Sequence, residues 1–214
     1  ITHPSEAQGK PRQIDLIAVC NLERGVLTPG IPKVEGGMAM VDCIVTAVEM
    51  AKRGEIAAVV TCPINKALMQ QAGHCYEGHT QLIASLARCE DYVMMLAGEK
   101  LRVALVTIHC SLREVPLLLS KEKVYKTISV TSRALQRDFG VKSPRIAVAA
   151  LNPHAGEEGL FGKEEEEVIR PAIQKAKADG HQVEGPFPAD SLFFRAAGGE
   201  FDEVVDMYHD QGLI

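Results

Sequence analysis

Tryptophan is absent from the 214-residue sequence, and Phe, Trp and Tyr together make up only 5% of it. A surface that binds single-stranded nucleic acid uses aromatic side chains for stacking, so this composition argues against such a surface. Basic residues are also in the minority, since 23 Lys and Arg stand against 28 Asp and Glu and the formal net charge is -5. We therefore expect no nucleic acid partner.

Long hydrophobic runs are missing as well. The apolar runs, such as residues 56–62, are far shorter than the roughly 20 residues that a membrane-spanning helix needs. The first residues show no basic segment followed by an apolar stretch, so the sequence predicts no secretory signal and no membrane partner. The six cysteines occur without CxxC spacing, which argues against a disulfide framework and favours a reducing cytoplasm.

Several catalytic fingerprints are also absent. There is no GxGxxG after a predicted strand, so the usual phosphate-binding turn of a Rossmann domain is missing. Walker A, HExxH and GxSxG motifs are missing too. Any nucleotide or metal chemistry must therefore use another arrangement of residues.

The sequence does contain a regular alternation of strand and helix patterns. Hydrophobic residues make up 46% and charged residues 24%, as in soluble globular proteins. Short β-branched runs separated by helical patterns predict an α/β fold with a mostly parallel sheet. The expected strands cover residues 14–20, 56–61, 92–97, 101–108, 145–151 and 202–207. The expected helices cover residues 38–52, 66–72, 80–88, 121–139 and 163–179.

Three of the seven histidines lie at or just beyond the carboxyl ends of expected strands: His109, His154 and His209. In open α/β sheets this edge is where ligands bind. Three neutral imidazoles there would form a divalent metal site with an open position for substrate, and would suit Zn²⁺, Co²⁺ or Ni²⁺ better than Mg²⁺. Each histidine could instead cap its strand and contact only local backbone.

Other candidates accompany the histidines. Lys66 follows a predicted strand next to Asn65, where it could pair with a carboxylate or phosphate, or only be solvated. His79 and Thr80 end a glycine-rich loop, where Thr80 is a candidate helix N-cap and His79 a candidate ligand-binding residue. The polar loop at residues 152–157 could hold an anion or be an ordinary connection. The glutamates at 164–167 are interpreted as a solvated first helical turn that complements the helix dipole.

Five segments then carry a resemblance to a known family. They are TCPINKALMQQAGHCYEGHT, LRVALVTIHCSL, RIAVAALNPHAGEEGLFGKEE, GPFPADSLF and FDEVVDMYHDQGL. In order and spacing, from about residue 41 onward, the sequence resembles the 4-hydroxythreonine-4-phosphate dehydrogenase (PdxA) family of pyridoxal phosphate biosynthesis. The resemblance implies a fold like isocitrate and isopropylmalate dehydrogenases, with mostly parallel sheets in two lobes around an active-site cleft. It implies a first lobe at residues 1–78 and a second, with the metal ligands, at 79–214.

The resemblance also implies roles for individual residues. The family's metal ligands correspond to His109, His154 and His209, and its substrate-binding His-Thr pair corresponds to His79 and Thr80. The expected reaction is oxidation of a small phosphorylated substrate, 4-phosphohydroxy-L-threonine, at C3 and then decarboxylation to 3-amino-2-oxopropyl phosphate. The implied cofactors are NAD or NADP and a divalent metal (Zn, alternatively Co, Mg or Mn), in a cytoplasmic homodimer with the metal site at its interface. The candidates for the acid or base that moves protons are Asp190, Asp210 and Lys66.

The sequence also departs from the family pattern. It has no counterpart of the family's GDPAGIGPE-like segment, and nothing follows DQGLI, so we expect residues to be missing from both ends. Three alternatives stay open: a 4-phosphothreonate or erythronate dehydrogenase of the same family, a metal-dependent hydrolase, and a non-catalytic metal or metabolite binder. The hydrolase would turn over without nicotinamide, and the binder would be stabilised by its ligand without any reaction.

Overall fold

The computed structural model describes residues 1–23, 25, 27–28, 30–76 and 78–213. The chain forms two compact units, Ile1–Glu90 and Asp91–Ile214. We predicted lobes at 1–78 and 79–214, whereas this division comes twelve residues later. The helix α3 (His79–Ala87) lies in the first unit because it packs on α1 (Val34–Lys52).

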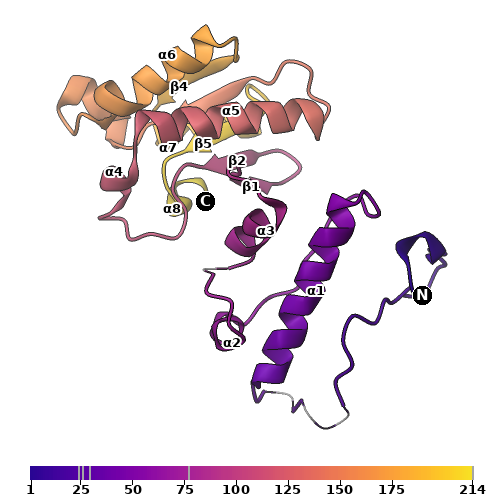
Figure 1. The fold of residues 1–214 in the computed structure, drawn as a ribbon. Helices are drawn as coiled ribbons and strands as arrows, with labels where there is room; N and C mark the ends of the chain where they lie inside the picture. The colour runs from indigo at the N-terminus through magenta and orange to yellow at the C-terminus, as the bar shows by residue number, and fades with distance from the viewer. Residues whose placement is uncertain (24, 26, 29, 77, 214) are drawn as a thin grey trace. The chain divides into compact units, whose positions relative to one another are not determined.

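The second unit is built on a five-stranded sheet in the order β1-β2-β5-β3-β4 (Figure 1). Only β1 and β2 are antiparallel, and the pairs β2–β5, β5–β3 and β3–β4 are parallel. The predicted α/β class with a mostly parallel sheet is therefore confirmed. The strands are β1 (Met94–Ala97), β2 (Arg102–Leu105), β3 (Ile146–Ala149), β4 (Val183–Phe187) and β5 (Glu203–Asp206).

The central strand β5 aligns the carboxyl ends of its two neighbours. Its residue Val204 pairs with Val103 of β2 and with Ala147 of β3. Beyond the strand ends, the Thr107 hydroxyl donates to the Met207 carbonyl oxygen at 2.7 Å. The loops that follow β2, β3 and β5 therefore leave the sheet at the same edge.

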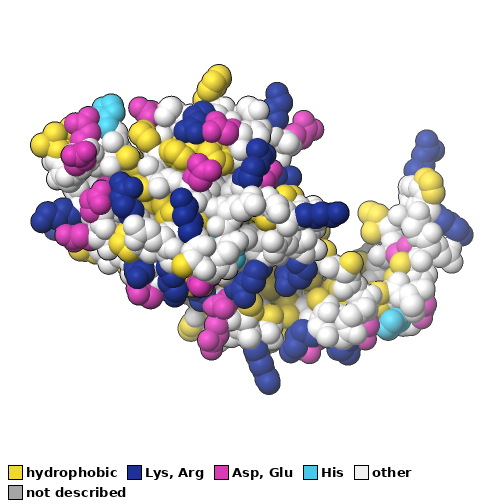
Figure 2. Space-filling view, turned by 90° about the horizontal axis from the view of Figure 1, so that it is seen from above, with side chains coloured by type: hydrophobic (Ala, Val, Ile, Leu, Met, Phe, Trp, Pro, Cys, Tyr) yellow, Lys and Arg dark blue, Asp and Glu magenta, His cyan; other side chains and the backbone are white. Residues whose placement is uncertain are grey.

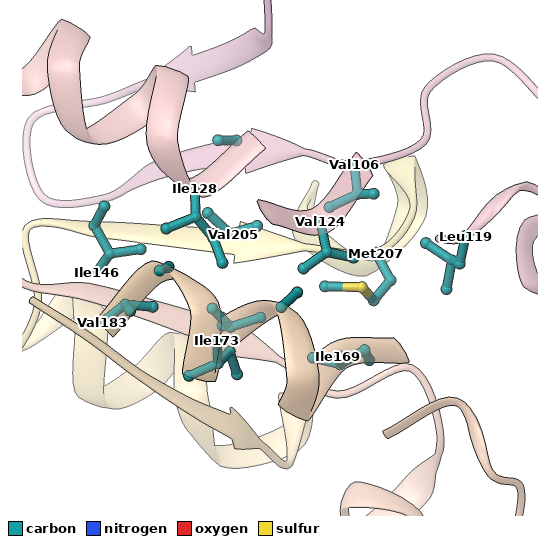
Figure 3. Close-up of a cluster of buried hydrophobic side chains, with 14 of the residues drawn as sticks. Val106, Leu119, Val124, Ile128, Ile146, Ile169, Ile173, Val183, Val205 and Met207 are labelled. Atoms are coloured by element: carbon teal, nitrogen blue, oxygen red, sulfur yellow. The ribbon is translucent and has the colours of Figure 1, made fainter. Parts of the chain in front are cut away.

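Helices cover both faces of this sheet. One face packs against α5 (Lys121–Arg137) and α6 (Arg170–Ala178), and the other against α7 (Ala189–Ala197). The α5 sequence places Val124, Ile128 and Leu135 on one stripe, and all three are fully buried. Figure 3 shows the buried cluster in which α5 and α6 meet one face of the sheet. Its labelled side chains are Val106, Leu119, Val124, Ile128, Ile146, Ile169, Ile173, Val183, Val205 and Met207.

The sequence did not predict two of the main elements of this unit, β4 and α7. The β4 sequence, VEGPF, contains glycine and proline, which interrupt the apolar pattern of a strand. Three further short helical segments were also not expected: α4 (Val115–Leu118), η2 (Pro153–Gly159) and α8 (His209–Gly212). The expected helix at 163–179 begins instead as a π-helical segment, η3 (Glu165–Ile169), before α6.

The first unit contains helices around a small core. Its helices are η1 (Pro4–Glu6), α1, α2 (Lys66–Gln71) and α3. Gly37 of α1 lies against α2, where a Cβ atom would stand 2.7 Å from the Leu68 carbonyl oxygen. The buried core residues are Val41, Ile44, Val48, Met69 and Leu82.

The predicted strands at residues 14–20 and 56–61 are wrong for the described chain. Neither segment forms a strand, and Ile14 and Val60 are 92% and 96% exposed. A strand needs a hydrogen-bonded partner, and the described part of the first unit contains no sheet that could supply one. An apolar run carries no information about that partner.

The surface carries charges of both signs. On the face shown in Figure 2, Lys and Arg side chains are interspersed with Asp and Glu side chains. Within the described residues, none of the helices combines the length and the apolar character required for a membrane span.

Candidate functional site

The three predicted ligand histidines follow three neighbouring parallel strands. His109 comes after β2, His154 after β3, and His209 after β5. Because β5 lies between β2 and β3, all three residues leave the sheet at one edge. His109 and His154 are exposed and His209 is half-buried, so their rings are accessible to a ligand.

The structure brings two of these rings together. The ring centres of His109 and His209 are 5.7 Å apart at an angle of 46°. Two imidazoles on one tetrahedral Zn²⁺, with bonds of about 2.0–2.1 Å, have ring centres roughly 5 Å apart, so the spacing of this pair is close to that of two ligands of one ion. The His154 ring instead lies beside Phe161, with centres 6.4 Å apart. Within the described chain, no three His, Cys, Asp or Glu side chains stand close enough to hold a metal ion.

Asp210 contacts the third histidine directly. Its Oδ1 lies 2.9 Å from Nδ1 of His209, while 91% of its side chain is exposed. This contact favours the imidazole form with its proton on Nδ1, which leaves the Nε2 lone pair for a metal ion.

A cavity of about 480 Å³ lies beside these strand ends. It brings His154, which follows β3, together with Asp190 of α7 and Asp210 of α8. Phe193 supplies an apolar wall, and Asn152, Tyr208 and Gln211 add further polar groups. Two of the three predicted acid or base candidates, Asp190 and Asp210, therefore face the same space as a predicted ligand.

The backbone that carries His154 has an unusual conformation. Five consecutive residues, His154 to Glu158, have positive φ angles, of 52°, 56°, 80°, 41° and 54°. Only the third, Gly156, is a glycine, and each other residue costs roughly 1–2 kcal/mol in this left-handed region. Such a turn persists only when surrounding contacts fix it.

Glu165 lies directly behind this turn, which corrects the interpretation of residues 164–167 as solvated. Its side chain is only 1% exposed, and Oε1 accepts hydrogen bonds from the Leu151 and Asn152 backbone N–H groups at 2.9 and 2.8 Å. The neighbouring Glu166 is exposed and pairs with Arg170, as expected. Sequence patterns did not identify Glu165 because four successive glutamates do not show which one faces inward.

Gln211 is a second residue that sequence reasoning missed. Its buried amide accepts a hydrogen bond from Met207 N–H at 2.8 Å and donates one to the Ala150 carbonyl oxygen at 2.7 Å. The side chain thus ties the end of β5 to the end of β3, on either side of the cavity. Its position in the MYHDQGL segment, which carries part of the family resemblance, could have indicated a role for it.

Two further carboxyl groups are buried in β5. Burial raises the pKa of Glu203 to about 8, although Arg102 opposes this shift. Burial also raises the pKa of Asp206 to about 8, and the nearby Glu203 adds to the shift. Neither carboxyl group has a hydrogen-bond partner among the described residues.

The remaining candidates lie in the first unit. Asn65 caps α2, since its Oδ1 accepts the Leu68 N–H at 3.1 Å, so it has a local structural role. Lys66 is exposed, and its Cε would lie 3.9 Å from a Cβ atom built on Gly78. The side chain therefore passes close to the first turn of α3.

His79 and Thr80 form that first turn. His79 is half-buried and Thr80 is exposed. The expectation that Thr80 caps this helix is wrong, because α3 begins at His79 with Gly78 as its cap. The positive end of the helix dipole at this helix start, with Lys66 close by, makes a suitable environment for an anion.

A family model described as "Pyridoxal phosphate biosynthetic protein PdxA" matches residues 1–214. The chain belongs to the PdxA family. The resemblance inferred from the five segments is thereby confirmed, and all the candidate residues lie within the matched range.

Individual PdxA relatives agree with this assignment. A 4-hydroxythreonine-4-phosphate dehydrogenase from Desulforapulum autotrophicum is 50% identical over 201 residues, covering 94% of this chain and 59% of its own. A D-threonate 4-phosphate dehydrogenase from Pectobacterium atrosepticum is 41% identical over 214 residues, covering 100% of this chain and 65% of its own. The chain thus spans less than two thirds of the length of these relatives.

A solved PdxA structure matches the fold closely. The crystal structure of a 4-hydroxythreonine-4-phosphate dehydrogenase from Klebsiella pneumoniae has a TM-score of 0.95 and 43% identity, and covers 99% of this chain and 65% of its own. The predicted isocitrate/isopropylmalate dehydrogenase-like fold class is confirmed by this likeness and by the mostly parallel sheet.

Proposed function

We propose that the chain belongs to an enzyme that oxidises 4-phosphohydroxy-L-threonine at C3, with NAD or NADP as hydride acceptor. Decarboxylation then yields 3-amino-2-oxopropyl phosphate, a step in pyridoxal 5'-phosphate biosynthesis. One observation carries this proposal: three histidines follow three adjacent parallel strands in a chain that the PdxA model matches throughout. The name of the Desulforapulum relative supports it.

We assign the divalent metal to His109, His154 and His209. The donor set suits Zn²⁺ best by ligand softness, with Co²⁺, Mg²⁺ and Mn²⁺ as alternatives. When bound, such a metal supplies a Lewis acid that lowers the pKa of the substrate hydroxyl and stabilises the charge that develops as CO₂ leaves. Asp210 holds the His209 ring through its Nδ1 contact at 2.9 Å.

The proton transfers are assigned to carboxylates on the cavity wall or to Lys66. Asp190 and Asp210 both line the cavity that His154 faces, and both are exposed, so either can exchange protons with solvent. Lys66, His79 and Thr80 form a second group in the first unit. We assign His79 and Thr80 to an anionic group of the substrate, its phosphate or carboxylate.

We further propose a homodimer in which the metal site lies at the interface. The described residues of one chain bring only two of the three ligand rings together, and a second copy would supply what this incomplete set lacks. We also place the enzyme in the cytoplasm, since its six cysteines are free thiols, as a reducing compartment maintains them.

A phosphothreonate or phosphoerythronate dehydrogenase is the second candidate. The name of the Pectobacterium relative supports it, and the same residues would serve that reaction at C3. A metal-dependent hydrolase would use the same histidines to activate water and would need no nicotinamide.

One assay tests these proposals together. NADH formation is followed by absorbance in the full-length protein with Zn²⁺ and either phosphohydroxythreonine or phosphothreonate. We expect turnover of phosphohydroxythreonine with the larger kcat/KM, and loss of both turnover and bound metal in His154→Ala. Preference for phosphothreonate would support the second candidate, and metal-dependent turnover without nicotinamide would support the hydrolase.

A further inference from the structure

The carboxylate of Glu165 is buried behind the loop that carries His154, and it serves no ion pair among the described residues. It accepts three hydrogen bonds instead. Oε1 accepts the Leu151 and Asn152 backbone N–H groups at 2.9 and 2.8 Å, and Oε2 accepts the Asn152 side-chain amide at 2.9 Å. A buried carboxylate is costly unless such donors stabilise it, so this arrangement is a specific one.

The same carboxylate also contacts the middle of the left-handed turn. A Cβ atom on Gly156 would stand 2.6 Å from Glu165 Oε2, so glycine is the residue that fits there. Glu165 therefore holds the chain by hydrogen bonds just before His154, and its carboxylate lies close to the Gly156 backbone two residues after His154. Between these contacts the backbone of His154 has a positive φ of 52°.

The backbone of Glu165 belongs to a segment that packs into the core of the second unit. Glu165 begins the π-helical segment η3, whose last residue, Ile169, is fully buried among the core side chains of Figure 3. Such π-helical segments occur frequently at functional sites. The anchor of the loop is thus the rigid core of the second unit.

We propose that Glu165 is a positioning residue for His154. Its carboxylate holds the backbone of Leu151 and Asn152 and lies close to Gly156, and thereby orients the loop that carries the His154 imidazole towards the metal site. This inference rests on the proposed function, because it requires that His154 is a metal ligand.

The test compares Zn²⁺ affinity in the full-length protein and three variants. In Glu165→Gln, one amide oxygen can still accept the backbone N–H groups, but the new NH₂ group cannot accept the Asn152 amide. In Gly156→Ala, the new methyl group would collide with the Glu165 carboxylate and displace it. The matched control is Glu166→Gln, next in the chain, where the glutamate is exposed and pairs with Arg170.

We expect Glu165→Gln and Gly156→Ala to lower Zn²⁺ affinity about 10- to 100-fold, as measured by competition with a chromogenic chelator. The Michaelis constant for NAD and the affinity of Glu166→Gln should stay at the wild-type value. A purely structural role would instead lower the melting temperature without changing the Zn²⁺ affinity of the folded protein, and that result would overturn the proposal. Failure of both variants to fold would also overturn it, in favour of a folding role.

The two proposals fail in different ways. If the wild-type protein binds Zn²⁺, loses it in His154→Ala, and keeps full affinity in Glu165→Gln, only the positioning role is wrong. If the wild-type protein binds no divalent metal, or His154→Ala retains it, the proposed metal site itself is wrong.

Discussion

Glu203 and Asp206 occupy the central strand of the sheet, where water cannot reach their carboxyl groups. Because the pKa of each is raised to about 8, both groups keep their protons in the folded protein at neutral pH. In the unfolded chain both are ionised above their ordinary pKa values, near 4. Folding is therefore coupled to proton uptake at these two residues.

This coupling predicts the pH dependence of stability. As pH rises from about 4.5 to about 8, the unfolded chain releases the Glu203 proton while the folded chain keeps it, so stability falls over this window and is constant above it. Glu203→Gln mimics the protonated acid and removes this penalty. At pH 8 we expect the free energy of unfolding of the variant to exceed that of wild type by about a few kcal/mol, so that the variant unfolds at a higher temperature. At pH 5 the two proteins should unfold at nearly the same temperature.

Thermal unfolding followed by circular dichroism across pH 5–8 measures the effect. Glu200→Gln is the matched control, because Glu200 is exposed and paired with Arg195, which lowers its pKa. The control should show no stabilisation that grows with pH. Parallel stability curves for Glu203→Gln and wild type would contradict a raised pKa in the folded state.

The positions of single residues were predictable where a strand ended and unpredictable where a helix began. His109, His154 and His209 could be placed at one sheet edge because a strand pattern locates its own end. Glu165 could not be recognised, since its inward direction depends on a π-helical start that shifts the phase of the helix. The distances among the three histidine rings likewise depend on loop conformations, such as the left-handed turn, that no residue pattern encodes.

The packing of α1 on α2 depends on one of two adjacent glycines. Gly37 faces α2 so closely that the methyl group of Gly37→Ala must push the Leu68 backbone away. Such overpacking typically lowers the free energy of unfolding by about 1–3 kcal/mol. At Gly36 a Cβ atom would meet only the end of the Leu27 side chain, at 3.1 Å. In Gly36→Ala, the higher helix propensity of alanine should raise the free energy of unfolding by up to about 1 kcal/mol.

Denaturant unfolding of the two variants distinguishes these effects. We expect opposite signs, with Gly37→Ala less stable and Gly36→Ala as stable as wild type or more so. Equal and small changes in both would mean that α1 and α2 are not in close contact in solution.

Whole elements were predicted well where one face of a repeated pattern is buried. The stripe on α5 and the β-branched runs of β2, β3 and β5 all identified real elements. The failures have one physical origin, which is that strands depend on distant partners. Residues 14–20 have strand-like composition without a partner in the described chain, and β4 has a partner, β3, without strand-like composition.

In the proposed homodimer, metal binding and dimer formation should depend on each other. If ligands from two copies hold one ion, each equilibrium stabilises the other by linkage. We expect removal of metal with a chelator to lower the melting temperature and to weaken dimerisation together. Sedimentation at low protein concentration, with and without Zn²⁺, measures the second effect.

His109→Ala is the companion variant for this experiment. It should resemble the metal-free protein in both melting temperature and dimerisation, and added Zn²⁺ should restore neither. An active monomer loaded with metal would refute the shared site, while the assignment of the three histidines would stand.

The order of strands in the sheet has a consequence for synthesis on the ribosome. β5 lies between β2 and β3, yet Val204 pairs with Val103, about 100 residues earlier. Until residues 203–206 have left the exit tunnel, β2 and β3 each expose an edge with unpaired N–H and C=O groups. The nascent second unit therefore cannot complete its core as it emerges, and its folding waits for β5, which is made after the two strands it joins.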